Sequence, residues 1–262
     1  MEIRLEILML GLIQGLTEWL PISSSGHLRV LEILFGLKPL PFFEIMLHMA
    51  TLIITLLYFR AEVYKILVAL IRLNFKSEEG ALIPRLLTGL ASSATVGLLT
   101  TILINDIFYR IAPLGAAFLF SGLLIYASKR GKCIKEYVDY RSAAIIGVMQ
   151  GLSIIPGLSR SGLTISVALM LGIKREVAFK FSFLLSIPAI LGAIILMILF
   201  QADLPIDGSL ELTNIFASCL TAGVVGYFSL KFLYRFLQKF HLFSLYLLPL
   251  GLLLILVDIM LG

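Results

Sequence analysis

Apolar side chains fill most of this chain in long runs that a few short polar segments interrupt. A helix needs roughly 20 residues to cross about 30 Å of hydrocarbon. Six runs reach this length, so we predict spans at approximately 42–59, 83–104, 111–128, 179–200, 212–230 and 242–261. The runs are continuous and do not alternate with a period of two, which indicates helices and not a β-barrel. The segment 61–74 is shorter and carries several charges, so we expect an amphipathic helix on the membrane surface.

Composition supports the same class of protein. Hydrophobic residues make up 60% of the chain and charged residues only 14%, whereas soluble domains have roughly 25% charged residues. We therefore expect an integral membrane protein. The net charge of +5 does not predict nucleic-acid binding, because the basic residues gather in loops between spans. Cys133 and Cys219 form no disulfide framework or metal motif.

Two polar segments, 11–27 and 147–164, are related by a constant offset of 136 positions. At this offset seven residues of the first segment meet identical residues in the second. They are Gly11, Gln14, Gly15, Leu16, Ser23, Ser25 and Gly26. We therefore predict one polytopic membrane domain, 1–262, that contains internal repeats at approximately 1–128 and 142–262.

Each polar segment contains two short helices that are separated by a proline and a Ser/Gly cluster. Neither helix is long enough to cross the bilayer, so each pair should enter and leave on one side as a re-entrant hairpin. Three predicted spans separate the hairpins, an odd number, so the repeats are inverted and the two tips can meet. Inverted repeats with broken helices often form a binding site at the bilayer midplane.

The distribution of lysine and arginine predicts the orientation. Of 21 such residues, 16 fall on one face in the six-span arrangement, in loops 60–85 and 129–141 and after the second repeat and the fifth span. The loop 201–211, on the opposite face, carries three acidic residues and no basic one. Basic loops stay in the cytoplasm, so both termini and the mouth of the first hairpin should lie outside.

The first tip carries a carboxylate and a row of hydroxyls. Gln14 and Glu18 are four residues apart and share one helix face. An ionisable glutamate at membrane depth is costly unless it is paired or has a function. The chain then breaks at Pro21 and restarts after Ser23-Ser24-Ser25-Gly26.

The second tip breaks at Pro156-Gly157 and restarts near Ser159-Arg160-Ser161. A restarting helix presents free N–H groups and the positive end of its dipole, which together favour anions. The planar guanidinium of Arg160 suits phosphate oxygens. If the tips meet, they form a phosphate site with Glu18 and His27 beside it. A purely structural pair between Glu18 and Arg160 is the alternative.

Other polar side chains receive more ordinary interpretations. We expect Trp19 to anchor the protein at the membrane interface. His48 lies within a span and is expected to pack or to support the site indirectly, whereas Glu44 is expected to be solvated. The sequence contains no His/Cys cluster that suggests zinc.

At these residues the chain resembles the BacA/UppP family of undecaprenyl-diphosphate phosphatases. One signature runs from Gln14 to Glu18 and continues into the Ser-rich turn that ends at His27; the other is the nine-residue run 156–164. The resemblance spans almost the whole chain. It implies an all-α integral membrane protein with six transmembrane helices plus two re-entrant hairpins in interlocked inverted repeats. It also implies a site open to the outer face of the plasma membrane.

The resemblance implies hydrolysis of a polyprenyl diphosphate to the monophosphate and inorganic phosphate. This reaction recycles the lipid carrier for cell-envelope glycan synthesis and is linked to bacitracin resistance. A divalent cation, Mg²⁺ or Ca²⁺, is expected to assist, with Glu18 as its protein ligand. Position 14 is glutamine where many relatives have glutamate, which removes one carboxylate from the site.

The expected roles follow from this chemistry. Ser24 is the preferred nucleophile, Glu18 its base or a metal ligand, and Arg160 the clamp on the terminal phosphate. His27 would protonate the leaving oxygen or activate Ser24. The substrate-binding residues are expected to be Gln14, Ser23, Ser25, Gly26, Gly157, Ser159, Ser161 and Thr164.

A polyprenyl-phosphate flippase is the alternative function, since inverted repeats with broken helices suit alternating access. A flippase needs phosphate binding but no nucleophile. The Ser-rich turn beside Glu18 and His27 favours the enzyme, although the two activities could coexist. Whether two copies form a homodimer is left open.

The inverted topology can be tested by cysteine labelling. A cysteine placed in loop 201–211 should react with a membrane-impermeant thiol reagent in intact cells. A cysteine in loop 129–141 should react only after permeabilisation, because that loop carries five basic residues and should remain in the cytoplasm. Labelling of both loops from one side would contradict the inverted arrangement.

Overall fold

The computed structural model describes residues 4–37, 41–104, 110–200 and 211–261. Within these ranges the regular structure is helical, and the only β-type pairing is an isolated bridge between Lys135 and Ile173. The prediction of an all-α protein is therefore confirmed for the described part of the chain. The acidic loop predicted at 201–211 lies almost entirely outside the described residues.

Eleven α-helices and two 3₁₀ helices are described. In chain order they are α1 (Leu5–Thr17), α2 (Ser24–Phe35), α3 (Pro41–Tyr58), α4 (Arg60–Ile71), α5 (Leu82–Leu103), α6 (Ile111–Ala127), η2 (Ser128–Arg130), α7 (Tyr140–Leu152), α8 (Arg160–Met170), α9 (Arg175–Phe200), α10 (Leu212–Phe236), η3 (Leu237–Phe243) and α11 (Ser244–Leu261).

Four helical stretches within the described residues are long and apolar enough to cross a membrane. They are Leu82–Leu103, Ile111–Arg130, Arg175–Leu196 and the 49-residue stretch Leu212–Met260, which combines α10, η3 and α11. A fifth candidate arises if α3 and α4 count as one broken span. The membrane class is therefore confirmed at the level of four or five candidate spans.

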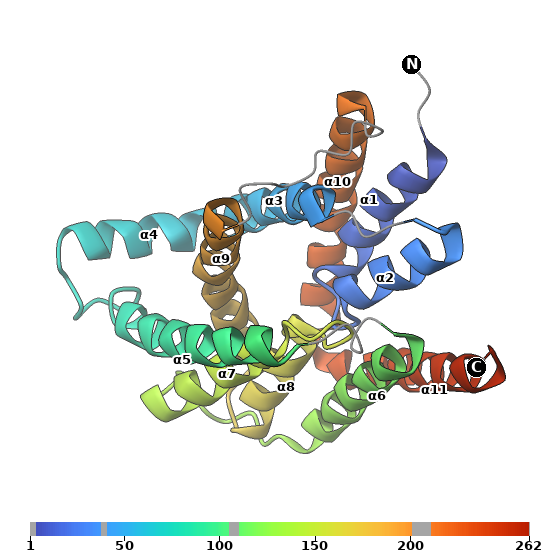
Figure 1. The fold of residues 1–262 in the computed structure, drawn as a ribbon. Coiled ribbons are helices and arrows are strands. Elements are labelled where there is room, and N and C mark those ends of the chain that lie inside the picture. The colour runs from blue at the N-terminus through green and yellow to red at the C-terminus, as the bar shows by residue number, and fades with distance from the viewer. Residues whose placement is uncertain (1–3, 38–40, 105–109, 201–210, 262) are drawn as a thin grey trace.

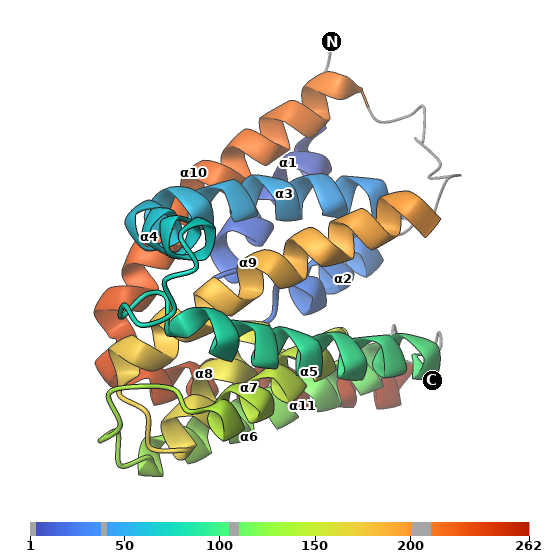
Figure 2. The same cartoon turned by 90° about the vertical axis from the view of Figure 1, so that its left-hand side faces the viewer.

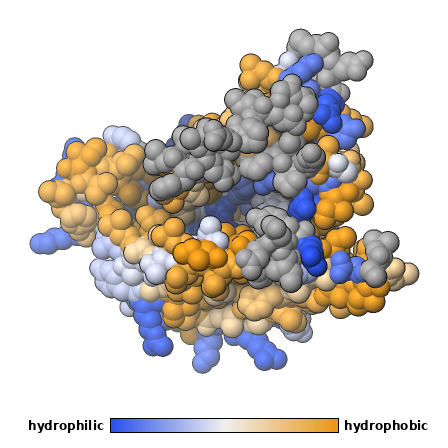
Figure 3. All heavy atoms as spheres, viewed as in Figure 1, coloured by the Kyte–Doolittle hydropathy of each residue, from blue (hydrophilic) through white to orange (hydrophobic). Residues whose placement is uncertain are grey.

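The helix α4 leaves α3 at an angle of 80°. It corresponds to the amphipathic helix predicted at 61–74. Large apolar side chains on it are exposed, with Tyr64 at 69% and Ile71 at 81%. Figure 3 shows hydrophobic side chains over the region where Figure 1 places α4. Such exposure is costly in water and is natural for a helix in contact with lipid.

Helices from the first half of the chain pack against helices from the second half in a reciprocal way. The short helix α1 lies along α10, and α7 lies along α5 (Figures 1 and 2). The third close pair is α6 with α11. Glycines mediate all three contacts, because small residues allow helix backbones to approach closely.

The glycine contacts leave no room for a side chain. A Cβ atom on Gly147 would lie 2.1 Å from the carbonyl oxygen of Gly89 in α5. A Cβ atom on Gly11 would lie 2.5 Å from the carbonyl oxygen of Ser218 in α10. Where α6 meets α11, a Cβ on either Gly115 or Gly251 would lie 2.7 Å from the carbonyl oxygen of the other.

Both predicted breaks are present, and both end in a capped helix. The helix α1 ends at Thr17, and α2 begins at Ser24, where the side chain of Ser23 accepts a hydrogen bond from the N–H of Gly26. The helix α7 ends at Leu152, and α8 begins after Ser159, which caps it in the same way. A serine side chain at this position satisfies one of the free amide groups of the first turn.

The start of α7 is fixed by Asp139, whose carboxylate accepts a hydrogen bond from the N–H of Ser142 at 2.7 Å. That hydrogen bond and Lys135 lower the pKa of Asp139 to about 2. The cap therefore stays ionised at neutral pH. Its stabilising effect is present above the ordinary pKa of aspartate and is lost as the pH falls towards 2.

Replacing Gly147 with alanine should destabilise the protein, because the new methyl group would overlap the backbone of α5. Overpacking of this kind costs about 1–3 kcal/mol, which should lower the thermal midpoint in detergent. Gly192 in α9 is the matched control, since a Cβ there meets no atom within 4 Å. Gly192→Ala should leave the midpoint unchanged or raise it. Equal midpoints for the two variants would contradict the tight α5–α7 contact.

Candidate active site

The two helix breaks meet inside the protein. A Cβ atom on Gly26 would lie 3.0 Å from the Cα of Gly157 and 2.5 Å from the ring of Phe118. Gly157 has a φ of 90°, a conformation that favours glycine. Both glycines are among the residues predicted to bind substrate. The structure shows that they also allow the two tips to touch.

A cavity of about 290 Å³ opens beside this contact. Its polar side is formed by the end of α1, the first residues of α2 and α8 and His48 of α3, and its apolar side mainly by α9 and Ile45 of α3. The lining residues include Glu18, Ser23, Ser24, Ser25, His48, Ser159 and Arg160, with Ile45, Ile190, Ala193 and Ile194 opposite.

The carboxylate of Glu18 is the centre of the polar side. One of its oxygens, Oε1, lies 2.6 Å from Nη2 of Arg160. The other, Oε2, accepts hydrogen bonds from Oγ of Ser24 at 2.6 Å and from Nε2 of Gln14 at 3.1 Å. Only 7% of Glu18 is exposed. Residues from both polar segments of the sequence therefore meet at one buried carboxylate, and Glu18 and Arg160 form the direct ion pair that the sequence offered as the alternative interpretation.

His48 reaches the same carboxylate from α3. Its Nδ1 atom lies 3.4 Å from Oε2 of Glu18 and 3.1 Å from Nε2 of Gln14. The sequence predicts only a packing or supporting role for this histidine, outside the candidate site residues. An ionisable side chain within a span was the available signal, but the sequence did not reveal which side of α3 faces the cavity.

The arrangement offers an anion two helix N-termini and a guanidinium. The helices α2 and α8 both begin at the cavity, and their first-turn amides have no partner within the helix. The Nη1 atom of Arg160 is buried without a hydrogen-bond partner in the described part of the chain. It is an unused donor on a residue that lines the cavity.

Comparison with known protein families gives a match over most of the chain. Residues 7–253 match the model of the family described as "Bacitracin resistance protein BacA". The chain belongs to the BacA family.

Relatives of similar length share much of the sequence. A protein of Carboxydothermus hydrogenoformans named undecaprenyl-diphosphatase is 39% identical, with 94% of each chain covered. One of Treponema denticola with the same name is 42% identical, again with 94% of each chain covered. A Bacillus cereus protein named undecaprenyl-diphosphatase 3 is 37% identical over 97% of each chain.

In this BacA family member, His27 does not line the cavity. Its Nδ1 lies 2.7 Å from the carbonyl oxygen of Ser23, and its Nε2 lies 2.8 Å from the hydroxyl of Tyr246 in α11. The imidazole also stacks on the Tyr246 ring. The structure therefore does not bring His27 to Ser24, because helix α2 directs the imidazole towards α6 and α11.

Two predicted hydroxyl donors are also engaged elsewhere. Thr164 bonds to Oγ of Ser182 at 2.6 Å, and Ser161 donates to the carbonyl oxygen of Leu20 at 3.3 Å. Neither residue lines the cavity. Both lie in the first turns of α8, where Ser161 faces the turn after α1 and Thr164 faces α9, so they stabilise the tip and do not reach into the cavity.

Trp19 is fully buried, with 0% exposure. The prediction that it anchors the protein at the membrane interface is therefore wrong. The side chain packs between helices next to the site, because the turn after α1 directs it inwards.

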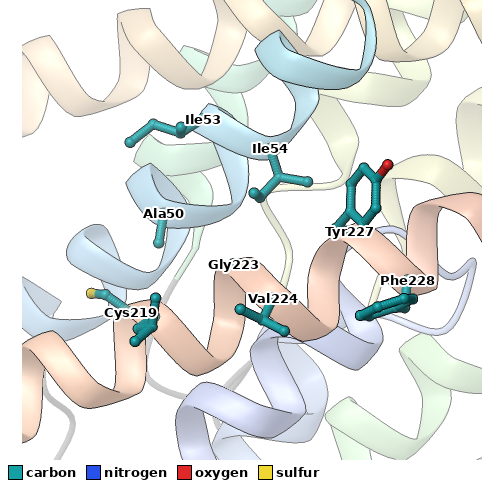
Figure 4. A pocket seen from close by; sticks show the side chains of 9 residues that line it. Ala50, Ile53, Ile54, Cys219, Gly223, Val224, Tyr227 and Phe228 are labelled. Atoms are coloured by element: carbon teal, nitrogen blue, oxygen red, sulfur yellow. The ribbon is translucent and has the colours of Figure 1, made fainter.

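A larger cavity of about 380 Å³ lies between α3 and α10 (Figure 4). Its walls are Ala50, Ile53, Ile54, Cys219, Leu220, Gly223, Val224, Tyr227 and Phe228. This lining contains no charged side chain, so the cavity is not suited to bind a phosphate group. Charged side chains line the cavity at Glu18 instead.

Proposed function

We propose that this chain hydrolyses undecaprenyl diphosphate, or a similar polyprenyl diphosphate, to the monophosphate and inorganic phosphate. The relatives named undecaprenyl-diphosphatase support this substrate. The observation that carries the proposal is the chain of short contacts from Ser24 to Glu18 to Arg160, each at 2.6 Å. It combines a nucleophile, a base and an anion-binding cation in one buried place.

Ser24 is the proposed nucleophile. Its Oγ attacks the terminal phosphorus while Glu18, which already accepts its hydrogen bond, takes the proton. The bond between that phosphorus and the bridging oxygen breaks, and the polyprenyl monophosphate leaves. Water then hydrolyses the phosphoserine and releases inorganic phosphate. This division into two steps is typical of an activated hydroxyl nucleophile.

Arg160 and the two helix N-termini hold the phosphate during the transfer. Phosphoryl transfer depends mainly on positioning and on charge stabilisation. The unpartnered Nη1 of Arg160 supplies one donor, and the first-turn amides of α2 and α8 supply others. Ser25 and Ser159, which line the cavity, add hydroxyl groups.

His48 is a better placed proton carrier than His27. It touches both Glu18 and Gln14 and lines the cavity. It can accept the proton that Glu18 takes from Ser24, or return one to the leaving oxygen. His27 instead fixes the turn through Ser23 and Tyr246.

The donor set fits only a cation that obtains most of its ligands from phosphate and water. No group of three or more His, Cys, Asp or Glu that could hold a metal occurs among the described residues. Glu18 and the carboxamide oxygen of Gln14, which is buried without a partner in the described structure, would hold Mg²⁺ or Ca²⁺. Such an ion would neutralise diphosphate charge.

The membrane arrangement is part of the proposal. Reciprocal packing of α1 on α10 and of α7 on α5 supports inverted repeats, as does the contact between Gly115 and Gly251, which are also 136 positions apart. In this arrangement α1/α2 and α7/α8 are re-entrant hairpins among six spans. The cavity then opens to the outer face of the plasma membrane, and its apolar wall on α9 receives the isoprenoid.

The comparisons give no support to the flippase alternative, since the relatives carry the name of a hydrolase. Formation of a homodimer stays a prediction, because the structure of a single chain does not test it.

Phosphate release from a defined polyprenyl diphosphate by the purified protein in detergent tests the proposal. Ser24→Ala should abolish release, because the attacking hydroxyl is lost. Glu18→Gln should lower turnover roughly 100- to 10,000-fold, since an amide cannot accept the proton. Ser166→Ala is the matched control, because this buried serine lies in α8 outside the cavity and should retain activity.

A second test compares the polyprenyl diphosphate with another substrate. The matching monophosphate should be hardly cleaved, because it lacks the terminal group that Arg160 holds. Substantial activity of Ser24→Ala beside an inactive Glu18→Gln would indicate direct attack by water. No phosphate release by the wild type, with lipid still moving across vesicles, would replace the hydrolase with a flippase.

A further inference from the structure

Trp19, the single tryptophan of the chain, lies directly behind the candidate active site. It follows Glu18 in the turn after α1 and is fully buried. A Cβ atom on Gly226 of α10 would lie 3.0 Å from its Nε1, and Thr51 of α3 borders the same notch. The ring of Phe183 in α9 lies 5.6 Å away, measured between ring centroids.

One face of this indole ring is directed at Arg160. The guanidinium carbon lies 6.0 Å from the ring centroid, which is the outer range of a cation–π contact. Two consecutive residues therefore hold one guanidinium. Glu18 fixes it through charge at 2.6 Å, and Trp19 provides a flat wall that restricts its orientation.

The indole N–H takes no part in this contact. Nε1 of Trp19 is buried without a hydrogen-bond partner in the described structure. A buried tryptophan usually pairs this group, and an interface anchor keeps it near water. At this position the indole therefore acts through its ring and not through a hydrogen bond. Gly226 provides the space for it, because any larger residue would press on Nε1.

We propose that Trp19 is a positioning residue that fixes the plane of the Arg160 guanidinium against the terminal phosphate, with Gly226 as the notch that seats it. The inference rests on the proposed hydrolase function. Bidentate recognition of a phosphate requires the planar guanidinium of Arg160 to have a defined orientation, and the indole ring fixes that orientation. Without the indole ring, the long side chain of Arg160 would keep its charge, but its guanidinium would no longer have a fixed orientation.

Steady-state kinetics of three variants test the proposal. Trp19→Leu should lower kcat roughly 10-fold while KM changes by less than about three-fold, since alignment matters most in the transition state. Trp19→Phe keeps a ring and should stay within about three-fold of wild type. Gly226→Ala keeps the tryptophan but displaces it, and should lower kcat by an intermediate factor. Leu16→Ala, a change on the exposed side of α1, is the control and should be unaffected.

The same tryptophan provides a readout that does not require turnover. A hydrolysis-resistant methylene-bridged analogue of farnesyl diphosphate should change the tryptophan fluorescence of the wild type in a saturable way, because its terminal phosphate binds Arg160 beside the indole. The change should be much smaller in Arg160→Lys at concentrations that a direct binding assay shows to be saturating for that variant. Trp19 is the only tryptophan, so excitation at the red edge of the indole absorption, where the nine tyrosines absorb little, reports on this residue.

Several results would overturn the proposal. These are wild-type kcat in folded Trp19→Leu, equal losses in Trp19→Leu and Trp19→Phe, or an emission change undiminished in Arg160→Lys. If Trp19→Leu does not fold, a wild-type kcat in Gly226→Ala would have the same effect. A wild type that binds the analogue but releases no phosphate from the diphosphate would contradict the proposed function instead, and the emission titration would still decide on the Trp19–Arg160 contact.

Discussion

A carboxylate placed away from water is the constraint on which the rest of this structure depends. Ionised Glu18 is costly in the interior unless charge and hydrogen bonds compensate for its lost hydration. The first half of the chain supplies Gln14 and Ser24 as hydrogen-bond donors, but the opposite charge comes from Arg160 in the second half. The two breaks must therefore meet for either charge to be tolerated. Where they meet, Glu18 is the only acidic side chain that lines the described cavity.

The helix packing makes this meeting possible. Because α1 and α7 are short, each must be held by a longer helix, and glycines bring their backbones into contact with α10 and α5. Tight contacts of this kind restrict rotation of the short helices, so the tips keep a fixed position. Catalysis by positioning requires such rigidity. Gly26 and Gly157 then allow the tips to approach to van der Waals contact.

Much of this arrangement could be predicted from the sequence, because the 136-residue offset and the polar breaks are visible without coordinates. The assumption that the tips meet predicted a shared site for Glu18, Ser24 and Arg160, whereas a direct pair between Glu18 and Arg160 was the alternative interpretation. The direction of single side chains did not follow. These helices are apolar on most sides, so no hydrophobic period shows which face is inward. For that reason the structure differs from the expected roles of three side chains. His48 contacts Glu18, Trp19 is buried and not at the membrane interface, and His27 does not line the cavity.

A double-mutant cycle on Glu18→Gln and Arg160→Gln tests the central claim most directly. The free energy of unfolding of the wild type, both single variants and the double variant would be measured in one detergent. If the two residues form the buried pair that joins the halves, each single change leaves an unpaired charge, and the double change removes both. The account predicts that the double variant loses less stability than the sum of the single losses, by about 1–3 kcal/mol. Additive losses would contradict it, because they would show that the two tips do not meet at this ion pair.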